Sequence, residues 1–182
     1  MPLFPIKFYR LCLLITLLLT VGSSYAENAD RQQPINLEAD SVVVDDAKKV
    51  STFLGQVKLT QGTLKITADK LLVTQGDDGF SVSTAIGQLA TFRQKREGSD
   101  EIIEGYAETI IYDTRNETVD LQSKARVKRS ADEVRGDHIN YNTRTEIFKV
   151  VGQTNTDSNI TNKGRVHAVI QPKNKDQNQA KP

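Results

Sequence analysis

Residues 52–70 read TFLGQVKLTQGTLKITADK and contain two short runs in which apolar and polar side chains alternate. In the first run Val57 and Leu59 alternate with polar residues, and the second run repeats the pattern. Successive side chains of a β-strand point to opposite faces of a sheet, so this period of two predicts strands with one apolar and one polar face. Gly62, between the runs, is typical of a tight turn, and the stretch therefore predicts a β-hairpin.

The alternation continues along most of the chain, and no proline occurs between Pro34 and Pro172. Proline removes a backbone donor from a sheet, so its absence indicates one uninterrupted β region. Groups of turn-forming residues divide this region: Asp45-Asp46, Gln61-Gly62, Gly76-Asp77-Asp78-Gly79, Glu97-Gly98-Ser99-Asp100 and Thr114-Arg115-Asn116. We predict an all-β fold, and the pattern is consistent with a sandwich, a barrel, a jelly roll or a β-solenoid.

A weak internal repeat favours a stack of similar units. Its first marker is a small residue followed by an acid, at Ala39-Asp40, Ala68-Asp69, Ala107-Glu108 and Gly136-Asp137. Its second marker is a glycine or serine, at Gly55, Gly87, Ser123 and Gly152. We interpret the acids as turn residues that accept backbone N–H bonds, and the glycines and serine as openings of the next strand pair. Each unit is then two hairpin-sized pieces that bury their apolar face by stacking.

The sequence resembles the OstA-like (LptA) family of periplasmic lipopolysaccharide transport bridge proteins. The most specific similarity is in residues 52–70, and it extends from about Gln33 to Ile170. Further matching stretches are 33–40 (QPINLEAD), 87–94 (GQLATFRQ), 103–107 (IEGYA) and 136–141 (GDHINY). The resemblance implies an open antiparallel β-jellyroll, a V-shaped stacked β-sheet whose interior holds the acyl chains of lipid A. It also implies head-to-tail homo-oligomers, an inner-membrane-anchored LptC-like partner and an outer-membrane LptD-like barrel partner.

The candidate lipid-binding residues are large apolar side chains on the predicted inner faces. The family pattern places Ile35, Phe92 and Tyr112 toward lipid. The full candidate set is Ile35, Leu37, Phe53, Phe92, Tyr112 and Phe148. Simple core filling is an equally good interpretation of any single one, because a groove lining and a core have similar composition.

The first and last predicted strands are candidate association edges. Unpaired edges invite strand addition, and these two carry few of the charges that normally block it. The candidate edge residues are Gln33, Ile35, Leu37, Val166, Ala168 and Ile170. The alternative is that a tail covers each edge.

The N-terminal residues form a predicted export signal. Lys7 and Arg10 precede an apolar run over residues 11–21, and a small-residue pattern ends at Ala26. The run is shorter than the roughly 20 residues that a membrane anchor needs, so we expect a signal peptide over residues 1–26, cleaved after Ala26, and a periplasmic location.

The remaining chain divides into a predicted domain and a tail. We expect an OstA-like β-jellyroll domain over residues 27–172 and a disordered polar tail over residues 173–182, which has too few apolar residues to pack.

Several function classes find no support in composition or motifs. Without Lys7 and Arg10 the chain has 24 − 2 = 22 basic and 23 acidic residues, which offers no basic surplus for nucleic acid. The single cysteine, Cys12, lies in the predicted signal, and His138 and His167 lack metal-ligand spacing. No nucleophile, phosphate-loop or dinucleotide motif occurs, so we expect no catalytic residue, metal or cofactor.

The sequence alone leaves three points open. Two basic groups are more consistent with a solvated outer face than with steering of an anionic lipid head group: Lys124, Arg126 and Lys128 on one face of a predicted strand, and Arg93, Lys95 and Arg96. A β-solenoid enzyme or binding module acting on envelope polysaccharide is the alternative function. A structural stack without a ligand is the second alternative.

Overall fold

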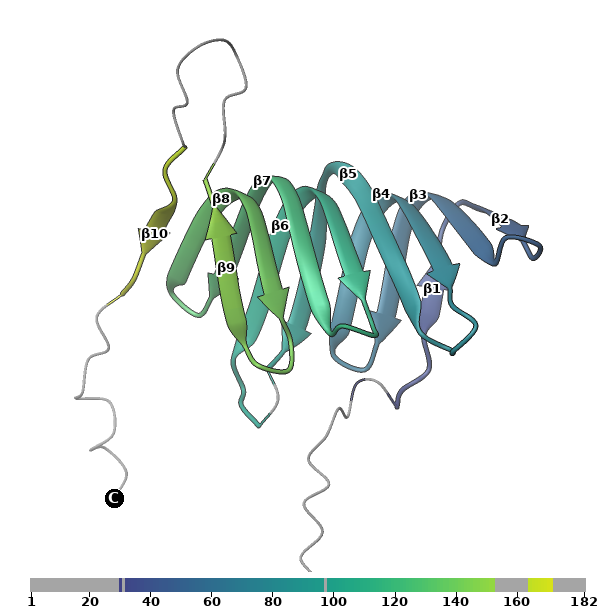
Figure 1. Ribbon diagram of the computed structural model, residues 1–182, viewed down its shortest axis with the longest axis horizontal. Coiled ribbons are helices and arrows are strands. Elements are labelled where there is room, and N and C mark those ends of the chain that lie inside the picture. The colour runs from purple at the N-terminus through teal and green to yellow at the C-terminus, as the bar shows by residue number, and fades with distance from the viewer. Residues whose placement is uncertain (1–29, 31, 97, 153–163, 172–182) are drawn as a thin grey trace, which may run out of the picture.

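The computed structural model describes residues 30, 32–96, 98–152 and 164–171. Within these ranges the chain forms strands and no helix, and all strands belong to one ten-stranded antiparallel sheet (Figure 1). The strands are β1 (Asn36–Glu38), β2 (Ser41–Asp45), β3 (Val50–Gln61), β4 (Leu64–Gln75), β5 (Ser81–Lys95), β6 (Ile102–Asp113), β7 (Thr118–Arg129), β8 (Asp132–Asn142), β9 (Ile147–Val151) and β10 (His167–Val169). Their order is β1-β3-β4-β5-β6-β7-β8-β10, with β2 beside β3 and β9 beside β8. The predicted all-β antiparallel class is confirmed.

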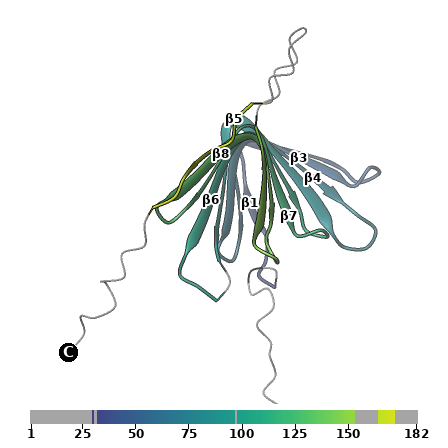
Figure 2. The ribbon, with the colours of Figure 1, turned by 60° about the vertical axis from the view of Figure 1, so that its left-hand side comes forward.

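Each long strand pair from β3–β4 to β7–β8 changes register once, near its middle. The shifts lie between Leu54 and Val57, Thr67 and Lys70, Ile86 and Ala90, Tyr106 and Thr109, and Gln122 and Ala125. Bulges of this kind bend a strand and increase its twist. Because they occur at the same level in neighbouring strands, they fold the whole sheet along one crease into a V (Figure 2).

The crease divides the sheet into two arms. Arm A ends in the β3–β4, β5–β6 and β7–β8 turns, and arm B ends in the β2–β3, β4–β5, β6–β7 and β8–β9 turns. Each of the long strands therefore contributes one half to each arm. The turns predicted at the ends of these strands lie where the sequence placed them, except that Glu97 is outside the described residues.

The repeat markers lie at the crease and not at the hairpin turns, so their interpretation as turns and strand openings was wrong. Gly55 is in the middle of β3 with φ +79°, and Ser123 is in the middle of β7 with φ +63°. Asp69, inside β4, accepts a hydrogen bond at 3.2 Å from the backbone N–H of Gln88, which lies in the neighbouring strand β5 at the crease. A bulge, like a turn, needs residues that adopt a left-handed backbone conformation and short side chains that accept hydrogen bonds. The sequence signals of bulges and turns are therefore alike.

The two ends of the sheet are built in the same way. β1 and β2 both pair with β3, one in each arm, and the break between them contains the marker Ala39-Asp40. β9 and β10 both pair with β8, one in each arm. Residues 153–163, between β9 and β10, are outside the described residues, as are the predicted signal peptide and the predicted tail.

Candidate functional site

The inner face of the V is mostly apolar, and its side chains are arranged in rows across the strands. One row of arm A is Leu37, Leu59, Ile66, Phe92, Gly105, Val127, Val134 and Ala168. The row of arm B nearest the crease is Phe53, Leu71, Ala85, Ile110, Leu121, Ile139 and Val150. The next row of arm B is Ser51, Val73, Ser83, Tyr112, Val119, Tyr141 and Phe148. The apolar surface thus continues from one end of the sheet to the other.

The two arms are packed against each other in this structure. Buried residues from both arms belong to one hydrophobic cluster. Gly105 of arm A leaves a space that Leu121 of arm B fills, because a Cβ at position 105 would lie 2.7 Å from Leu121 Cδ2. The two arms are therefore closely packed at Gly105 and Leu121.

Most of the candidate lipid-binding residues face this interior. Phe92 and Tyr112 are only 1% and 4% exposed. Leu37, Phe53 and Phe148 are partly buried against the same cluster. Ile35, which precedes β1, is 50% exposed and is not part of the buried cluster. Their role as lipid contacts remains a prediction.

Sequence reasoning missed one aromatic residue of the inner face. The ring of Tyr141 stacks on that of Phe148, with centroids 4.2 Å apart. Burial raises the pKa of Tyr141 to about 12. The signal was available, because Tyr141 alternates with Ile139, which also points inward.

The candidate edge residues lie at opposite ends of the sheet. Leu37 is in β1 and Ala168 is in β10. Ile35, Val166 and Ile170 directly flank these strands, and Gln33 lies further ahead of β1. The carbonyl oxygen of Gln33 accepts a hydrogen bond from Gln61 Nε2 of β3 at 3.1 Å. Among the described strands, β1, β2, β9 and β10 each pair on one side only. The prediction missed β2, whose three valines, Val42, Val43 and Val44, are all exposed.

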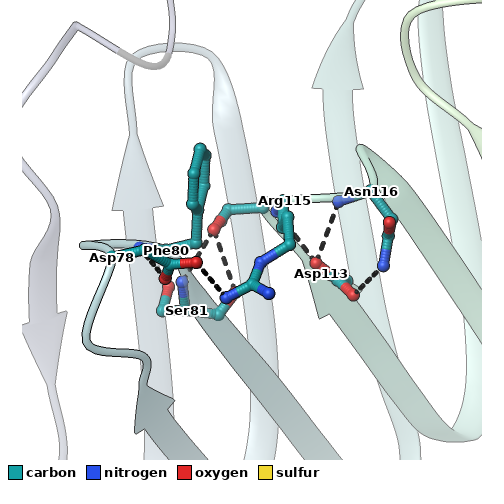
Figure 3. A network of polar contacts seen from close by, with 7 residues as sticks. Asp78, Phe80, Ser81, Asp113, Arg115 and Asn116 are labelled. Atoms are coloured by element: carbon teal, nitrogen blue, oxygen red, sulfur yellow. Dashed lines mark hydrogen bonds and ion pairs between the residues drawn. The ribbon is translucent and has the colours of Figure 1, made fainter.

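The rim of arm B is tied together between neighbouring turns (Figure 3). Arg115 of the β6–β7 turn pairs with Asp78 of the β4–β5 turn. Thr114 Oγ1 accepts a hydrogen bond from the Ser81 N–H at 2.8 Å. Burial raises the pKa of Asp113, but hydrogen bonds from the Asn116 and Arg115 N–H groups outweigh it and lower that pKa below its ordinary value. These contacts join the β4–β5 and β6–β7 turns to each other.

The basic residues of β7 lie away from the interior, as the alternation predicted. Ala125 and Val127, their neighbours in sequence, are buried. Lys128 pairs with Glu133 at 3.6 Å, and the Arg126 guanidinium lies 4.2 Å from the centroid of the Tyr106 ring. These contacts are on the outer face of arm A, so the interpretation as a solvated face is supported.

The described residues contain no helix that is long and apolar enough to cross a membrane. Within the same ranges, no group of three or more His, Cys, Asp or Glu side chains is placed to hold a metal ion.

One antiparallel sheet folded into a V, with an apolar interior and short strands at both ends, defines the class of open OstA-like β-jellyrolls. The chain belongs to the family described as LptA/(LptD N-terminal domain) LPS transport protein, whose sequence model matches residues 36–147.

Known relatives cover most of the chain. The lipopolysaccharide export system protein LptH of Pseudomonas aeruginosa is 34% identical over 91% of this chain and 95% of its own length. LptA of Escherichia coli K12 is 35% identical over 72% of each chain, and LptA of Haemophilus influenzae is 29% identical over 90% of this chain and 91% of its own. The crystal structure of LptH, the LptA homologous periplasmic component of the lipopolysaccharide transport device of P. aeruginosa, is similar with a TM-score of 0.70 and 32% identity. The match covers 79% of this chain and 99% of that one.

Proposed function

We propose that this protein carries lipopolysaccharide through the periplasm as a segment of a transenvelope bridge, with the lipid A acyl chains held between the two arms. The observation that carries the proposal is the uninterrupted apolar inner face, which runs from β1 to β10 in a chain of the LPS transport family. The matched relatives are named as export system proteins, so the alternative of an enzyme acting on envelope polysaccharide is not favoured.

A carrier of lipopolysaccharide needs a path that shields the acyl chains from water and also releases them. Burial of each CH₂ group contributes about 0.8 kcal/mol, so several acyl chains bind strongly even when only partly covered. The inner rows are mostly aliphatic and offer few fixed polar partners, which allows a lipid to slide along them. Because the interior is closed in the unloaded state, loading must exchange contacts between the arms for contacts with acyl chains.

The ends of the sheet supply a way to extend the path. Strand addition at β1 and β2 of one copy and at β9 and β10 of the next would join two inner faces, using main-chain hydrogen bonds. The same edges would accept an LptC-like partner at the inner membrane and an LptD-like partner at the outer membrane. Light scattering should therefore show a mass that rises with concentration, and a strict monomer at millimolar concentration would contradict end-to-end stacking.

Export requires the predicted signal. Cleavage after Ala26 would release a chain that begins at Glu27 and has no cysteine. N-terminal sequencing of the protein from a periplasmic extract should begin at Glu27, and an intact N-terminus there would contradict cleavage.

The direct test of the groove is photo-crosslinking in cells with benzoylphenylalanine at single positions. Phe92 and Tyr112 face the interior, whereas their matched controls Arg93 and Lys128 lie on the outer face. Lipopolysaccharide should be captured from positions 92 and 112 and not from positions 93 and 128. Equal capture from all four positions would rule out the assignment.

A further inference from the structure

The mouth of the V is bridged by an ion pair between the two arms. Arg96 follows β5 at the end of arm A, and Glu146 lies in the β8–β9 turn at the end of arm B. The Arg96 Nε–H donates to Glu146 Oε1 at 2.5 Å, and Arg96 Nη2 pairs with the second carboxylate oxygen. Arg96 Nη1 also donates to Glu101 of its own arm at 2.8 Å. One guanidinium therefore contacts both arms.

The ion pairs found elsewhere at the rim among the described residues join groups of the same arm. In arm B, Lys49 pairs with Asp77 and Arg144 pairs with Glu117. In arm A, Lys95 pairs with Asp100 at 2.6 Å. Pairs of this kind stiffen an arm but do not resist separation of the arms. The contact between Arg96 and Glu146 differs because it joins one arm to the other.

The bridging pair lies beside the aromatic end of the inner face. Glu146 precedes Ile147 and Phe148 in the chain, and its backbone N–H donates to the carbonyl of Asn142, the residue after Tyr141, at 2.8 Å. Tyr141 is stacked on Phe148, a candidate lipid contact. A lipid whose acyl chains lie on this aromatic surface would have its polar head at the level of the ion pair.

The ion pair is also suited to the exchange of Glu146 for another anion at Arg96. The side chains of Arg96 and Glu146 are 33% and 28% exposed, so water reaches both and neither charge is locked in the interior. When the arms separate, Arg96 keeps Glu101 and loses Glu146, and one edge of its planar guanidinium becomes free. Such an edge matches two oxygens of a phosphate group as well as it matches a carboxylate.

We propose that Arg96 is an anion-binding residue of the groove mouth, occupied by Glu146 while the arms are closed and transferred to a phosphate of the bound glycolipid when they open. The inference rests on the proposed function and adds the residue that recognises the charged head of the lipid. Glu146 is then an internal competitor that covers the site when no lipid is present.

The test compares the binding of lipid A and of dephosphorylated lipid A to purified variants. Arg96→Gln should weaken the binding of lipid A roughly tenfold, because a charge-assisted contact is lost, and should not weaken the binding of the dephosphorylated form. Arg96→Lys keeps the charge without the planar fork and should give an intermediate loss. Glu146→Gln should bind lipid A at least as tightly as the unaltered protein, because the competitor is removed.

The matched control is Lys95→Gln, which removes a neighbouring charge that pairs within arm A and should not alter binding of either lipid. Circular dichroism melts establish that each variant is folded. An equal loss for both lipids in Arg96→Gln, or a loss in Glu146→Gln or Lys95→Gln as large as that in Arg96→Gln, would overturn this inference alone. Failure of the unaltered protein to bind either lipid would overturn the proposed function.

Discussion

The contact between Gly105 and Leu121 provides a sharp test of whether the arms pack against each other. Gly105 belongs to the inner row of arm A, and a Cβ there would meet Leu121 Cδ2 of arm B at 2.7 Å. The φ angle of Gly105 is not positive, so alanine is compatible with the backbone at this position. The variant Gly105→Ala therefore reports on the space between the arms and not on backbone strain.

The sign of the change in unfolding free energy caused by Gly105→Ala distinguishes a closed interior from an open one. In a strand without an opposing side chain, replacing glycine by alanine stabilises a protein by roughly 0.5–1 kcal/mol, because glycine loses more entropy on folding. In the closed structure the added methyl must displace Leu121, which is 1% exposed and surrounded by other core residues. Overpacking of this kind costs about 1–3 kcal/mol, so we expect Gly105→Ala to lower the free energy of unfolding.

A double-mutant cycle assigns the effect to the contact between the arms. Leu121→Ala alone should cost about 2–5 kcal/mol because it leaves a cavity. In the double variant the methyl at position 105 occupies part of that cavity, so the two effects should differ from additivity by about 1–3 kcal/mol. Urea unfolding followed by circular dichroism measures all four proteins. A stabilising Gly105→Ala, or additivity within about 0.5 kcal/mol, would refute the closed packing.

Three further predictions address the crease and the inner face. Asp69→Ala removes the acceptor of the Gln88 N–H and should lower stability by about 0.5–1 kcal/mol in urea unfolding, whereas Asp69→Asn, which keeps an acceptor, should have a smaller effect. Ser123→Gly should raise the melting temperature, with a gain of about 0.5–1 kcal/mol, because position 123 has φ +63°; a lower melting temperature would contradict the left-handed bulge. Because the pKa of Tyr141 is raised from about 10 in the unfolded chain to about 12 in the fold, stability should be lost as pH rises through this window. Tyr141→Phe should lose less stability between pH 9 and pH 11, and identical losses would contradict the buried phenol.

The strands were predictable because their signal is local. The alternation of Val57 and Leu59 with polar neighbours depends only on which face of the sheet is buried. The crease was not predictable in the same way, because Asp69 and Ser123 carry the chemistry of a turn while lying in the middle of strands. Its sequence signature was found, but the three-dimensional meaning assigned to it was wrong.

The state of the candidate site depends on contacts that the sequence does not display. Inward-pointing side chains are apolar whether they face a lipid or the opposite arm, so the pattern around Phe92 could not reveal a closed interior. Arg96 and Glu146 are 50 positions apart and follow different strands, and no spacing rule connects them. The folded sheet brings them together across the mouth of the V.

In the proposed function, acyl chains bind between the arms and force them apart. Spin labels at Lys65→Cys and Thr74→Cys would be on the outer faces of arms A and B of β4, at exposed positions in a chain whose single native cysteine is Cys12. Pulsed electron paramagnetic resonance should show a longer distance between the labels with saturating lipopolysaccharide than without it, and no change with the polysaccharide freed of its lipid. An unchanged distance distribution in the loaded protein would contradict the account.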